Sequence, residues 1–278
     1  MKLHAGLIGD PVTHSLSPQL HNAAFAQVGI AAEYELWPTS AAELADRVAS
    51  LRATDVLGAN VTLPHKRAVM PLLDIIDPQA ALIGAINTIV RSEDSLLKGF
   101  NTDAPAFLMA LQEDVQYHVQ GQSVVVLGAS GAARAAVAAL LEGQAAHIVV
   151  INRTPERAES LLADVLEAGG GDPHLTTLTY DDPELPHVLQ DVSLIVNATS
   201  LGWKDDETPL DASLISSSML IFDMVYRSTR LLREATERGA QTHDGLTMLV
   251  RQAALAFQHW TGQPAPLDVM HAAVRSVR

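Results

Sequence analysis

Short apolar runs alternate along the chain with stretches in which apolar residues recur at helical spacing. The strand-like runs are Leu3 to Ile8, Glu33 to Trp37, Val56 to Val61, Ile86 to Val90, Val124 to Leu127, Ile148 to Ile151, Val192 to Val196 and Leu220 to Val225. Alternation of strands with helices is typical of α/β proteins, and unbroken runs such as VVVL and IVVI indicate parallel strands buried on both faces. We therefore predict an α/β fold with mostly parallel sheets.

The strand at Ser123 to Leu127 leads into a glycine turn, GASGAARAA, and an alanine-rich helix from Ala132 to Leu141. A dinucleotide-binding turn needs glycine where the chain leaves the strand and where the backbone approaches a pyrophosphate. Gly128 and Gly131 meet this need, although Ser130 makes the three-glycine pattern imperfect. Free amides at the start of the helix would meet the phosphates. The alternative is a turn that merely connects strand to helix.

The next strand ends in Asn152-Arg153-Thr154, about twenty residues on, where NAD enzymes usually carry an acidic residue for the ribose hydroxyls. A carboxylate there would repel a 2′-phosphate, whereas Arg153 can pair with it and Thr154 can donate a hydroxyl. A solvated arginine at a strand end is the alternative. With the glycine turn upstream, the pattern favours NADP over NAD as the cofactor.

Two domains are expected, of which the dinucleotide-binding one takes residues 104–244. Its first boundary is a glycine-containing turn that ends near Asp103, and its last strand signal lies near Gln241 to His243. The chain is helical from there to Val277, too late to extend a compact dinucleotide domain. We expect these helices to return to the N-terminal domain, which then comprises residues 1–103 and 245–278.

Composition excludes several function classes. The formal net charge is −14 and the longest basic block is HKR, so neither duplex nucleic acid nor an anionic membrane is an expected partner. With no cysteine, a thiol nucleophile and a thiolate zinc site are impossible, and the histidine spacings indicate no other metal site. The N-terminus lacks the apolar core of a signal peptide, so a cytoplasmic protein is expected.

Four N-terminal segments carry polar residues that neither a core nor a bland surface explains well. They are GDPVTHSLSPQLHN from Gly9, GANVTLPHK from Gly58, GAINT and GFNTD. Each residue has an ordinary interpretation when taken singly. Ser17 suits the cap of a helix started by Pro18, Lys66 suits a surface ion pair, and Asp103 suits a helix N-cap.

Taken together, these segments resemble the shikimate dehydrogenase family. The resemblance also includes GASGAARA, NRT, NATSLG, FDMVY and DGLTMLVRQAALAFQHWTG, in order and at matching spacing over nearly the whole chain. It implies an N-terminal α/β substrate domain, a Rossmann-like NADP-binding domain, and reversible NADPH-dependent reduction of 3-dehydroshikimate to shikimate in aromatic amino-acid biosynthesis, the chorismate pathway. One departure is Ser130, which stands where the family commonly has glycine.

The resemblance also implies a role for individual residues. Ser15 and Ser17 would bind the substrate carboxylate. The substrate ring hydroxyls would be held by Thr62, Asn87, Asp103 and Gln252, with Tyr226 approaching from the nucleotide domain. The pyrophosphate would meet Gly128, Ala129, Ser130, Gly131 and Ala132; the adenosine phosphate Asn152, Arg153, Thr154 and Arg157; and the nicotinamide Met224, Gly245 and Met248.

Lys66 is the implied general acid and base, with Asp103 beside it. A nicotinamide cofactor exchanges a hydride but supplies no proton for the substrate oxygen, so a second group is needed. Because a lysine amine is protonated at neutral pH, it can donate that proton in the reductive direction.

Two alternative functions remain open. A dual quinate and shikimate dehydrogenase, or one that prefers NAD, would share most motifs, although the paired serines and NRT favour the NADP-dependent form. A non-catalytic nucleotide-sensing protein would share the fold but has no need of Lys66 and Asp103. In each case the partner is a small molecule, and the chain is expected to be a monomer or a homodimer.

Overall fold

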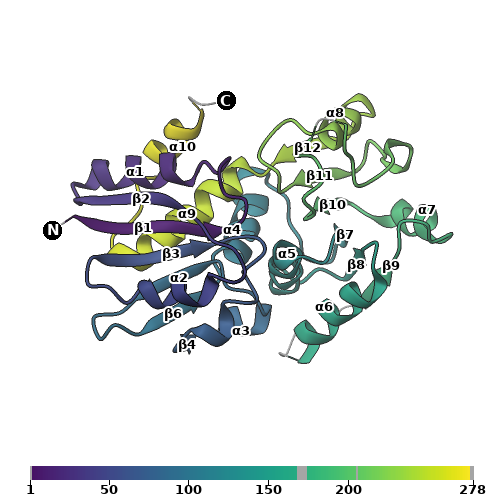
Figure 1. Ribbon diagram of the computed structural model, residues 1–278. Coiled ribbons are helices and arrows are strands. Elements are labelled where there is room, and N and C mark those ends of the chain that lie inside the picture. Colours follow the sequence, from purple (N-terminus) through teal and green to yellow (C-terminus); the bar gives the residue numbers. More distant parts are fainter. Residues whose placement is uncertain (1, 168–173, 205, 276–278) are drawn as a thin grey trace. The chain divides into compact units, whose positions relative to one another are not determined.

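The computed structural model describes residues 2–167, 174–204 and 206–275 (Figure 1). Contacts between Cα atoms divide the chain into two compact units. Unit 1 contains the described residues up to Ala106 and those from Val250 onward, and unit 2 runs from Phe107 to Leu249. Each unit is a β-sheet with helices, so the predicted α/β class is confirmed.

Unit 1 contains a six-stranded sheet in the order β2-β1-β3-β5-β6-β4. The strands are β1 (Leu3–Gly9), β2 (Ala32–Pro38), β3 (Val56–Val61), β4 (Ile75–Ile76), β5 (Thr88–Arg91) and β6 (Leu97–Phe100). β1 pairs in parallel with β2 and β3, but β5 runs antiparallel to both β3 and β6. β4 pairs in parallel with β6, so the expectation of mostly parallel pairing is confirmed and the antiparallel pairings are confined to β5. The short SEDSL connection makes β5 and β6 a hairpin.

The helices of unit 1 come from both ends of the chain. They are α1 (Ser17–Val28), α2 (Leu44–Ser50), α3 (Pro78–Ile83), the start of α4 (Asp103–Met109), most of α9 (Leu246–Thr261) and α10 (Leu267–Arg275), with a 3₁₀ turn at Met70–Leu72. α10 packs beside α1 (Figure 1). The predicted return of the C-terminal helices to the N-terminal unit is confirmed.

A close approach at Gly58 ties α9 to the sheet. The indole Nε1 of Trp260 donates to the carbonyl oxygen of Ile89 at 2.9 Å, directly over the glycine. A Cβ atom at Gly58 would contact that carbonyl oxygen and would lie 2.5 Å from the indole nitrogen. Glycine at position 58 is therefore required for the hydrogen bond that joins α9 to β5.

Unit 2 contains a second six-stranded sheet, in the order β12-β11-β10-β7-β8-β9, and every pairing in it is parallel. Its strands are β7 (Ser123–Leu127), β8 (His147–Ile151), β9 (His174–Leu178), β10 (Leu194–Asn197), β11 (Leu220–Asp223) and β12 (Gln241–Asp244). Its helices are α5 (Gly131–Glu142), α6 (Pro155–Glu167), α7 (Leu185–Val188) and α8 (Arg230–Glu237), with short turns at Ala110–Asp114, Leu189–Asp191 and Ala212–Leu214.

Counted from β7, this strand order is 3-2-1-4-5-6, the order of doubly wound dinucleotide-binding folds. The order of the strands reverses between β7 and β10. The central strands are completely buried, as the runs VVVL and IVVI predict: Val125, Val149 and Ile195 have no exposed surface.

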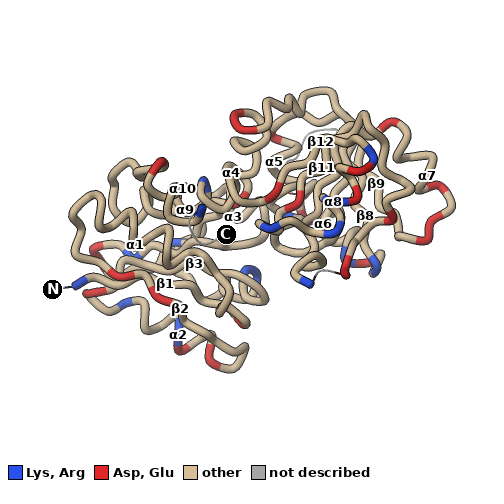
Figure 2. The backbone as a smooth tube through the Cα atoms, turned by 90° about the horizontal axis from the view of Figure 1, so that it is seen from above, with Lys and Arg blue, Asp and Glu red and all other residues tan. Residues whose placement is uncertain are grey.

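Two further features of the described residues are the distribution of charged side chains and the length of the apolar helices. Aspartate and glutamate are distributed over both units, with lysine and arginine interspersed (Figure 2), in keeping with the net charge of −14. Within residues 2–167, 174–204 and 206–275, no helix is both long enough and apolar enough to cross a membrane.

Substituting Gly58→Ala is expected to lower the free energy of unfolding by about 3 kcal/mol, since the added methyl group must displace Trp260 or Ile89. Urea and thermal unfolding would measure the loss. Gly29→Ala is the control, because Gly29 also has a positive φ of 72° but open space around its Cβ position. It should cost only about 1 kcal/mol of backbone strain. Equal losses in the two variants would contradict the steric argument.

Candidate functional site

In unit 1, the four polar segments of the sequence meet at one edge of the sheet. β1, β3 and β6 end at this edge, and β5 begins there because it runs antiparallel. Backbone hydrogen bonds join the segments: Val61 N donates to Asn87 O at 2.8 Å, and Asn87 N donates to Phe100 O at 3.1 Å. Asn87 therefore lies between the end of β3 and the end of β6.

Lys66 and Asp103 form a mostly buried ion pair at this edge. Lys66 Nζ lies 2.5 Å from Asp103 Oδ2, and the two side chains are 13% and 9% exposed. A bond of 2.8 Å from Ile86 N to Lys66 O fixes the lysine backbone. Asn101 Oδ1 accepts from the backbone N–H groups of Asp103 and Ala104 at 3.0 and 3.1 Å, so Asn101 caps α4. The interpretation of Asp103 as the N-cap is wrong, and its carboxylate instead faces the lysine.

Asn87 binds the other oxygen of the same carboxylate. Its Nδ2 donates to Asp103 Oδ1 at 2.8 Å, and its Oδ1 accepts from Thr102 N at 2.7 Å. Both oxygens of Asp103 thus have a donor. Burial of an ion pair is tolerated only when its remaining hydrogen-bonding positions are filled in this way.

The two serines of the first segment contact each other. Ser15 Oγ donates to Ser17 Oγ at 3.1 Å and accepts from Ser17 N at 3.2 Å. α1 begins at Ser17, its N-cap position is Leu16, and no side chain caps it. The interpretation of Ser17 as a helix cap is therefore wrong.

The remaining expected substrate residues of unit 1 are Thr62 and Gln252. The Thr62 methyl group packs against Gly9 at the end of β1, beside the edge where the segments meet. Gln252 lies half-buried on α9.

Several buried polar side chains behind this edge were given no role by the sequence analysis, although Asn60 and Thr88 lie in two of the polar segments. Tyr34 Oη donates to Asn60 Oδ1 at 2.9 Å, and Asn60 Nδ2 donates to Thr88 Oγ1 at 3.1 Å. His21 stacks on Tyr34 with ring centroids 4.4 Å apart, and burial lowers the pKa of His21 to about 3, so the imidazole is uncharged. The available signal was a polar residue within an apolar strand or helix face, which Tyr34, Asn60 and Thr88 share.

In unit 2, the expected cofactor residues all lie at the carboxyl edge of the parallel sheet. They follow β7 (Gly128 to Ala132), β8 (Asn152 to Arg157), β11 (Met224) and β12 (Gly245, Met248). Ligands of doubly wound sheets bind at this edge, at the point where the strand order reverses. That point lies between β7 and β10.

The turn after β7 packs closely against the segment that follows β10. Gly128 has a φ of +102°, and a Cβ there would lie 2.9 Å from Thr199 Cγ2. Ser130 is the N-cap of α5: its Oγ accepts from Ala132 N and Ala133 N at 3.2 and 3.3 Å. The expectation of free amides therefore fails for these two N–H groups.

Ser130 also joins the turns at the switch point, because its hydroxyl donates to Ala198 O, after β10, at 2.9 Å. The N-terminus of α5 still presents the positive end of a twelve-residue helix beside a glycine turn. This donor set fits the pyrophosphate of a dinucleotide.

Two exposed arginines follow β8. Arg153 and Arg157 both expose their side chains, and Arg157 N donates to Thr154 O at 3.2 Å where α6 begins. Asn152 Nδ2 donates to Thr154 O at 2.8 Å and shapes the turn between them. Burial raises the pKa of the neighbouring Tyr180 phenol to about 12, so no anion forms there to compete for Arg153. The turn offers two guanidinium groups to a phosphate.

Met224 and Gly245 are brought into contact at the ends of β11 and β12. A Cβ at Gly245 would contact the Met224 carbonyl oxygen, so only glycine permits this packing. Met248, on the first turn of α9, is 7% exposed. Tyr226 is half-buried and meets Trp203 edge to face, with ring centroids 5.0 Å apart.

Asp223, which the sequence analysis missed, holds the segment that carries Met224 and Tyr226. Its Oδ1 accepts from Asn197 Nδ2 at 2.9 Å and from Val225 N at 3.0 Å. Burial raises the pKa of Asp223 to about 6, against the opposing effect of these hydrogen bonds. The carboxylate fixes the loop that follows β11 to the end of β10.

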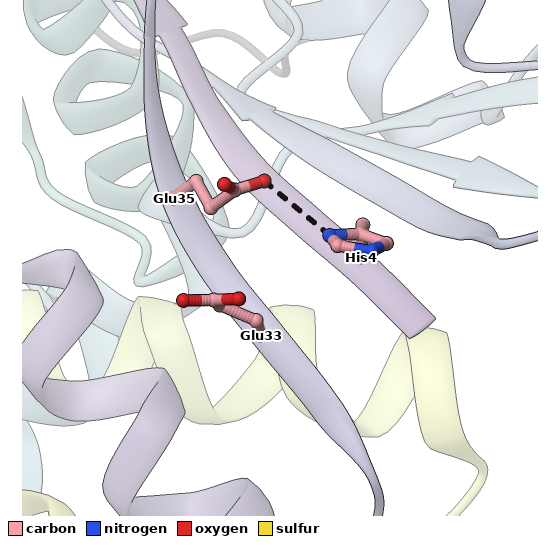
Figure 3. A group of neighbouring side chains, drawn as sticks. All are labelled: His4, Glu33 and Glu35. Atoms are coloured by element: carbon pink, nitrogen blue, oxygen red, sulfur yellow. Dashed lines mark ion pairs between the residues drawn. The ribbon is translucent and has the colours of Figure 1, made fainter. Parts of the chain in front are cut away.

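One group of possible metal ligands lies apart from these residues. His4 on β1 and Glu33 and Glu35 on β2 bring ligand atoms within 4.8 Å of one another (Figure 3). Lys2 Nζ already lies 2.5 Å from Glu33 Oε2, and His4 Nδ1 lies 3.4 Å from Glu35 Oε2. Glu33 is therefore paired with an ammonium group and Glu35 lies against the imidazole of His4, and we assign no metal to the group.

Three family models match consecutive parts of the chain. They are described as the shikimate dehydrogenase substrate binding domain (residues 7–89), shikimate / quinate 5-dehydrogenase (residues 110–202) and the shikimate 5′-dehydrogenase C-terminal domain (residues 245–275). The matches cover both units and most of the positions described above.

Individual relatives agree over nearly the full length. The chain is 43% identical to a shikimate dehydrogenase (NADP⁺) of Moorella thermoacetica over 273 residues, which cover 97% of this chain and 91% of the relative. The crystal structure of Thermus thermophilus shikimate 5-dehydrogenase in complex with NADP(H) and shikimate superposes with a TM-score of 0.87 at 37% identity, covering 99% of this chain and all of that one. A quinate dehydrogenase from Corynebacterium glutamicum in complex with NAD gives a TM-score of 0.89 at 29% identity, covering 99% of each chain. The matches cover an N-terminal substrate domain and a Rossmann-like domain in the same order along the chain. The chain therefore belongs to the shikimate dehydrogenase family.

Proposed function

We propose that this chain catalyses the reversible NADPH-dependent reduction of 3-dehydroshikimate to shikimate, with unit 1 as the substrate-binding domain and unit 2 as the NADP-binding domain. The observation that carries the proposal is the buried Lys66–Asp103 pair, 2.5 Å apart, in a chain aligned almost end to end with NADP-dependent relatives. A sensor that only binds a nucleotide has no need of a proton-transfer group, so the presence of Lys66 beside Asp103 favours catalysis over nucleotide sensing.

Lys66 is the proton donor in this proposal. NADPH supplies the hydride to the substrate carbon. Lys66 Nζ donates a proton to the ketone oxygen as the alcohol forms, and takes it back in the oxidative direction. Asp103 orients the lysine, because its Oδ2 accepts a hydrogen bond from Lys66 Nζ while Asn87 holds Oδ1. Proton transfer by a positioned group contributes about 10²- to 10⁴-fold in rate.

Substrate recognition is assigned to the remaining polar residues. The Ser15–Ser17 pair would donate hydrogen bonds from two hydroxyl groups to the substrate carboxylate, since the two oxygens lie 3.1 Å apart. Ser15 is half-buried, whereas Ser17 is buried. The ring hydroxyls are assigned to Thr62, Asn87, Asp103 and Gln252, and Tyr226 is assigned to the substrate from the resemblance.

Cofactor recognition is assigned to the carboxyl edge of the second sheet. The pyrophosphate is assigned to the turn formed by Gly128, Ala129, Ser130, Gly131 and Ala132. The adenosine phosphate is assigned to Asn152, Arg153, Thr154 and Arg157, and the nicotinamide to Met224, Gly245 and Met248. The exposure of both guanidinium groups supports this assignment, because a phosphate can reach them without rearrangement of the core.

The proposed setting is the cytoplasm, as a monomer or a homodimer that acts on a small molecule. Support comes from the biosynthetic relatives and from the net charge of −14, which opposes binding to nucleic acid.

The proposed function predicts that NADPH absorbance falls when 3-dehydroshikimate is added to the protein. Shikimate and quinate should be assayed side by side in the oxidative direction, with NADP and with NAD. Faster turnover of quinate, or preference for NAD, would favour the alternative that resembles the Corynebacterium glutamicum enzyme. Stoichiometric NADPH binding without oxidation would favour a nucleotide sensor.

Lys66→Ala is expected to lower kcat by about 10²- to 10⁴-fold with little change in KM, since the lost group moves a proton in the transition state. Steady-state kinetics with 3-dehydroshikimate would measure both constants. Lys2→Ala is the control, because Lys2 also forms an ion pair in unit 1 but is 58% exposed. Turnover near that of the unchanged protein in Lys66→Ala would remove Lys66 from the chemistry.

Arg153→Ala is expected to weaken NADP binding by about tenfold or more and to leave NAD binding nearly unchanged, because only NADP carries the phosphate that a guanidinium pairs with. Calorimetric titration with each cofactor would test this. Arg233→Ala removes another exposed arginine, on α8 of the same unit, and should affect neither cofactor. Equal losses for NADP and NAD in Arg153→Ala would contradict the assignment.

A further inference from the structure

A row of buried hydrogen bonds crosses the sheet of unit 1 and ends at Asp103. Tyr34 Oη donates to Asn60 Oδ1 at 2.9 Å, and Asn60 Nδ2 donates to Thr88 Oγ1 at 3.1 Å. Thr88 Oγ1 donates to Asn87 Oδ1 at 3.0 Å, and Asn87 Nδ2 donates to Asp103 Oδ1 at 2.8 Å. Every donor in the row points toward the carboxylate.

The chemistry of the groups fixes this direction. An amide NH₂ group can only donate and an amide oxygen can only accept. Since Asn60 donates to the Thr88 hydroxyl, Thr88 must give its single proton to a different acceptor. Asn87 Oδ1 is nearer, at 3.0 Å, than Thr102 Oγ1, at 3.3 Å. Burial raises the pKa of the Tyr34 phenol, so the first group of the row also keeps its proton.

The orientation of the Asn87 amide decides what Asp103 meets. Its oxygen accepts from Thr102 N at 2.7 Å and from Thr88 Oγ1 at 3.0 Å, and lies 3.2 Å from Thr102 Oγ1. Its nitrogen donates to Asp103 Oδ1 at 2.8 Å and to Thr102 Oγ1 at 2.9 Å. If the amide were reversed, its oxygen would face an anion. Aligned hydrogen bonds polarise one another in a buried environment, so the Thr88 donor strengthens the bond from Asn87 to Asp103.

We propose that Thr88 is a positioning residue for the reaction proposed above: its hydroxyl orients the Asn87 amide, which holds one oxygen of Asp103 so that the other faces Lys66. Thr88 is completely buried and Asn60 and Asn87 are 4% and 3% exposed, so water does not replace the lost donor at low cost. The inference rests on the proposed function for its kinetic consequence, but not for its geometry.

Thr88→Val tests the hydroxyl because valine keeps the shape and the strand preference of threonine. Loss of the hydrogen bond from Thr88 to Asn87 predicts a fall in kcat of about tenfold, with KM changed by less than about threefold. The variant also removes one acceptor of Asn60 Nδ2, which keeps its bond to Asn87 O at 3.2 Å. Thr88→Ser keeps the donor and should restore kcat to within about threefold. Thr261→Val, which removes a hydroxyl bonded to Phe257 O at 2.8 Å at the end of α9, is the control and should leave kcat unchanged.

A double-mutant cycle separates positioning through Asn87 from a general loss of stability. If Thr88 acts through the amide, Thr88→Val adds less than about twofold to the loss in kcat/KM already caused by Asn87→Ala. An undiminished tenfold effect in the Asn87→Ala background would overturn the proposal. So would unchanged kcat in Thr88→Val, or a loss in Thr88→Ser as large as that in Thr88→Val.

A measurement on the unliganded protein keeps the geometry testable without any turnover. The side-chain amide protons of Asn87 should give ¹H–¹⁵N signals that exchange slowly with water, because both the amide and its acceptor are buried. Thr88→Val should shift these signals and accelerate their exchange at least about tenfold, while Thr88→Ser and Thr261→Val should not. Unchanged Asn87 signals in Thr88→Val would overturn the proposal. Failure of the proposed function appears separately, as the absence of 3-dehydroshikimate reduction in the unchanged protein.

Discussion

The organisation of unit 1 depends on the burial of one ion pair, Lys66 with Asp103. Removing two charges from water costs several kcal/mol for each ion, and the attraction between them offsets this only when their other hydrogen-bonding positions are filled. Asn87 donates to one oxygen of the Asp103 carboxylate. Asn101 caps α4 instead of Asp103, which leaves that carboxylate to Lys66. The antiparallel entry of β5 is what brings Asn87 to the edge where β3 and β6 end. The antiparallel position of β5 in the mixed sheet therefore supports the burial of the ion pair.

Unit 2 satisfies a different constraint. An all-parallel sheet with the order 3-2-1-4-5-6 brings the ends of all its strands to one edge, so short segments that are far apart in the sequence become neighbours without long loops. Gly128 and Gly245 permit the closest approaches at that edge, to Thr199 and to Met224. Asp223 adds a buried carboxylate that fixes the segment after β11. The sheet determines where the segments at this edge lie, and these few residues determine their local conformation.

Hydrophobic patterning was sufficient to predict the buried parallel strands, because every residue in Val124 to Leu127 and in Ile148 to Ile151 is apolar. It failed for β4, β6 and β9, which are very short or carry polar residues at half-buried positions, as Lys98 does in β6. The Lys66–Asp103 pair joins positions far apart in sequence, so residue-level arguments made Lys66 a surface lysine and Asp103 a helix N-cap, and only the family resemblance connected them. Thr88 was missed because a buried threonine in a strand has the same pattern as a residue that only packs.

Ser130 changes the energetics of any anion that meets the start of α5. Its hydroxyl oxygen already accepts from the amides of Ala132 and Ala133, and its proton is held by Ala198 O. A phosphate oxygen at those amides would replace a neutral oxygen and would not occupy empty donors. The free energy gained on binding is then the difference between an anionic and a neutral acceptor, less the cost of breaking the hydrogen bond from Ser130 to Ala198 O after β10. Without a ligand, the turn after β7 thus satisfies these amides itself and is hydrogen-bonded to the segment after β10.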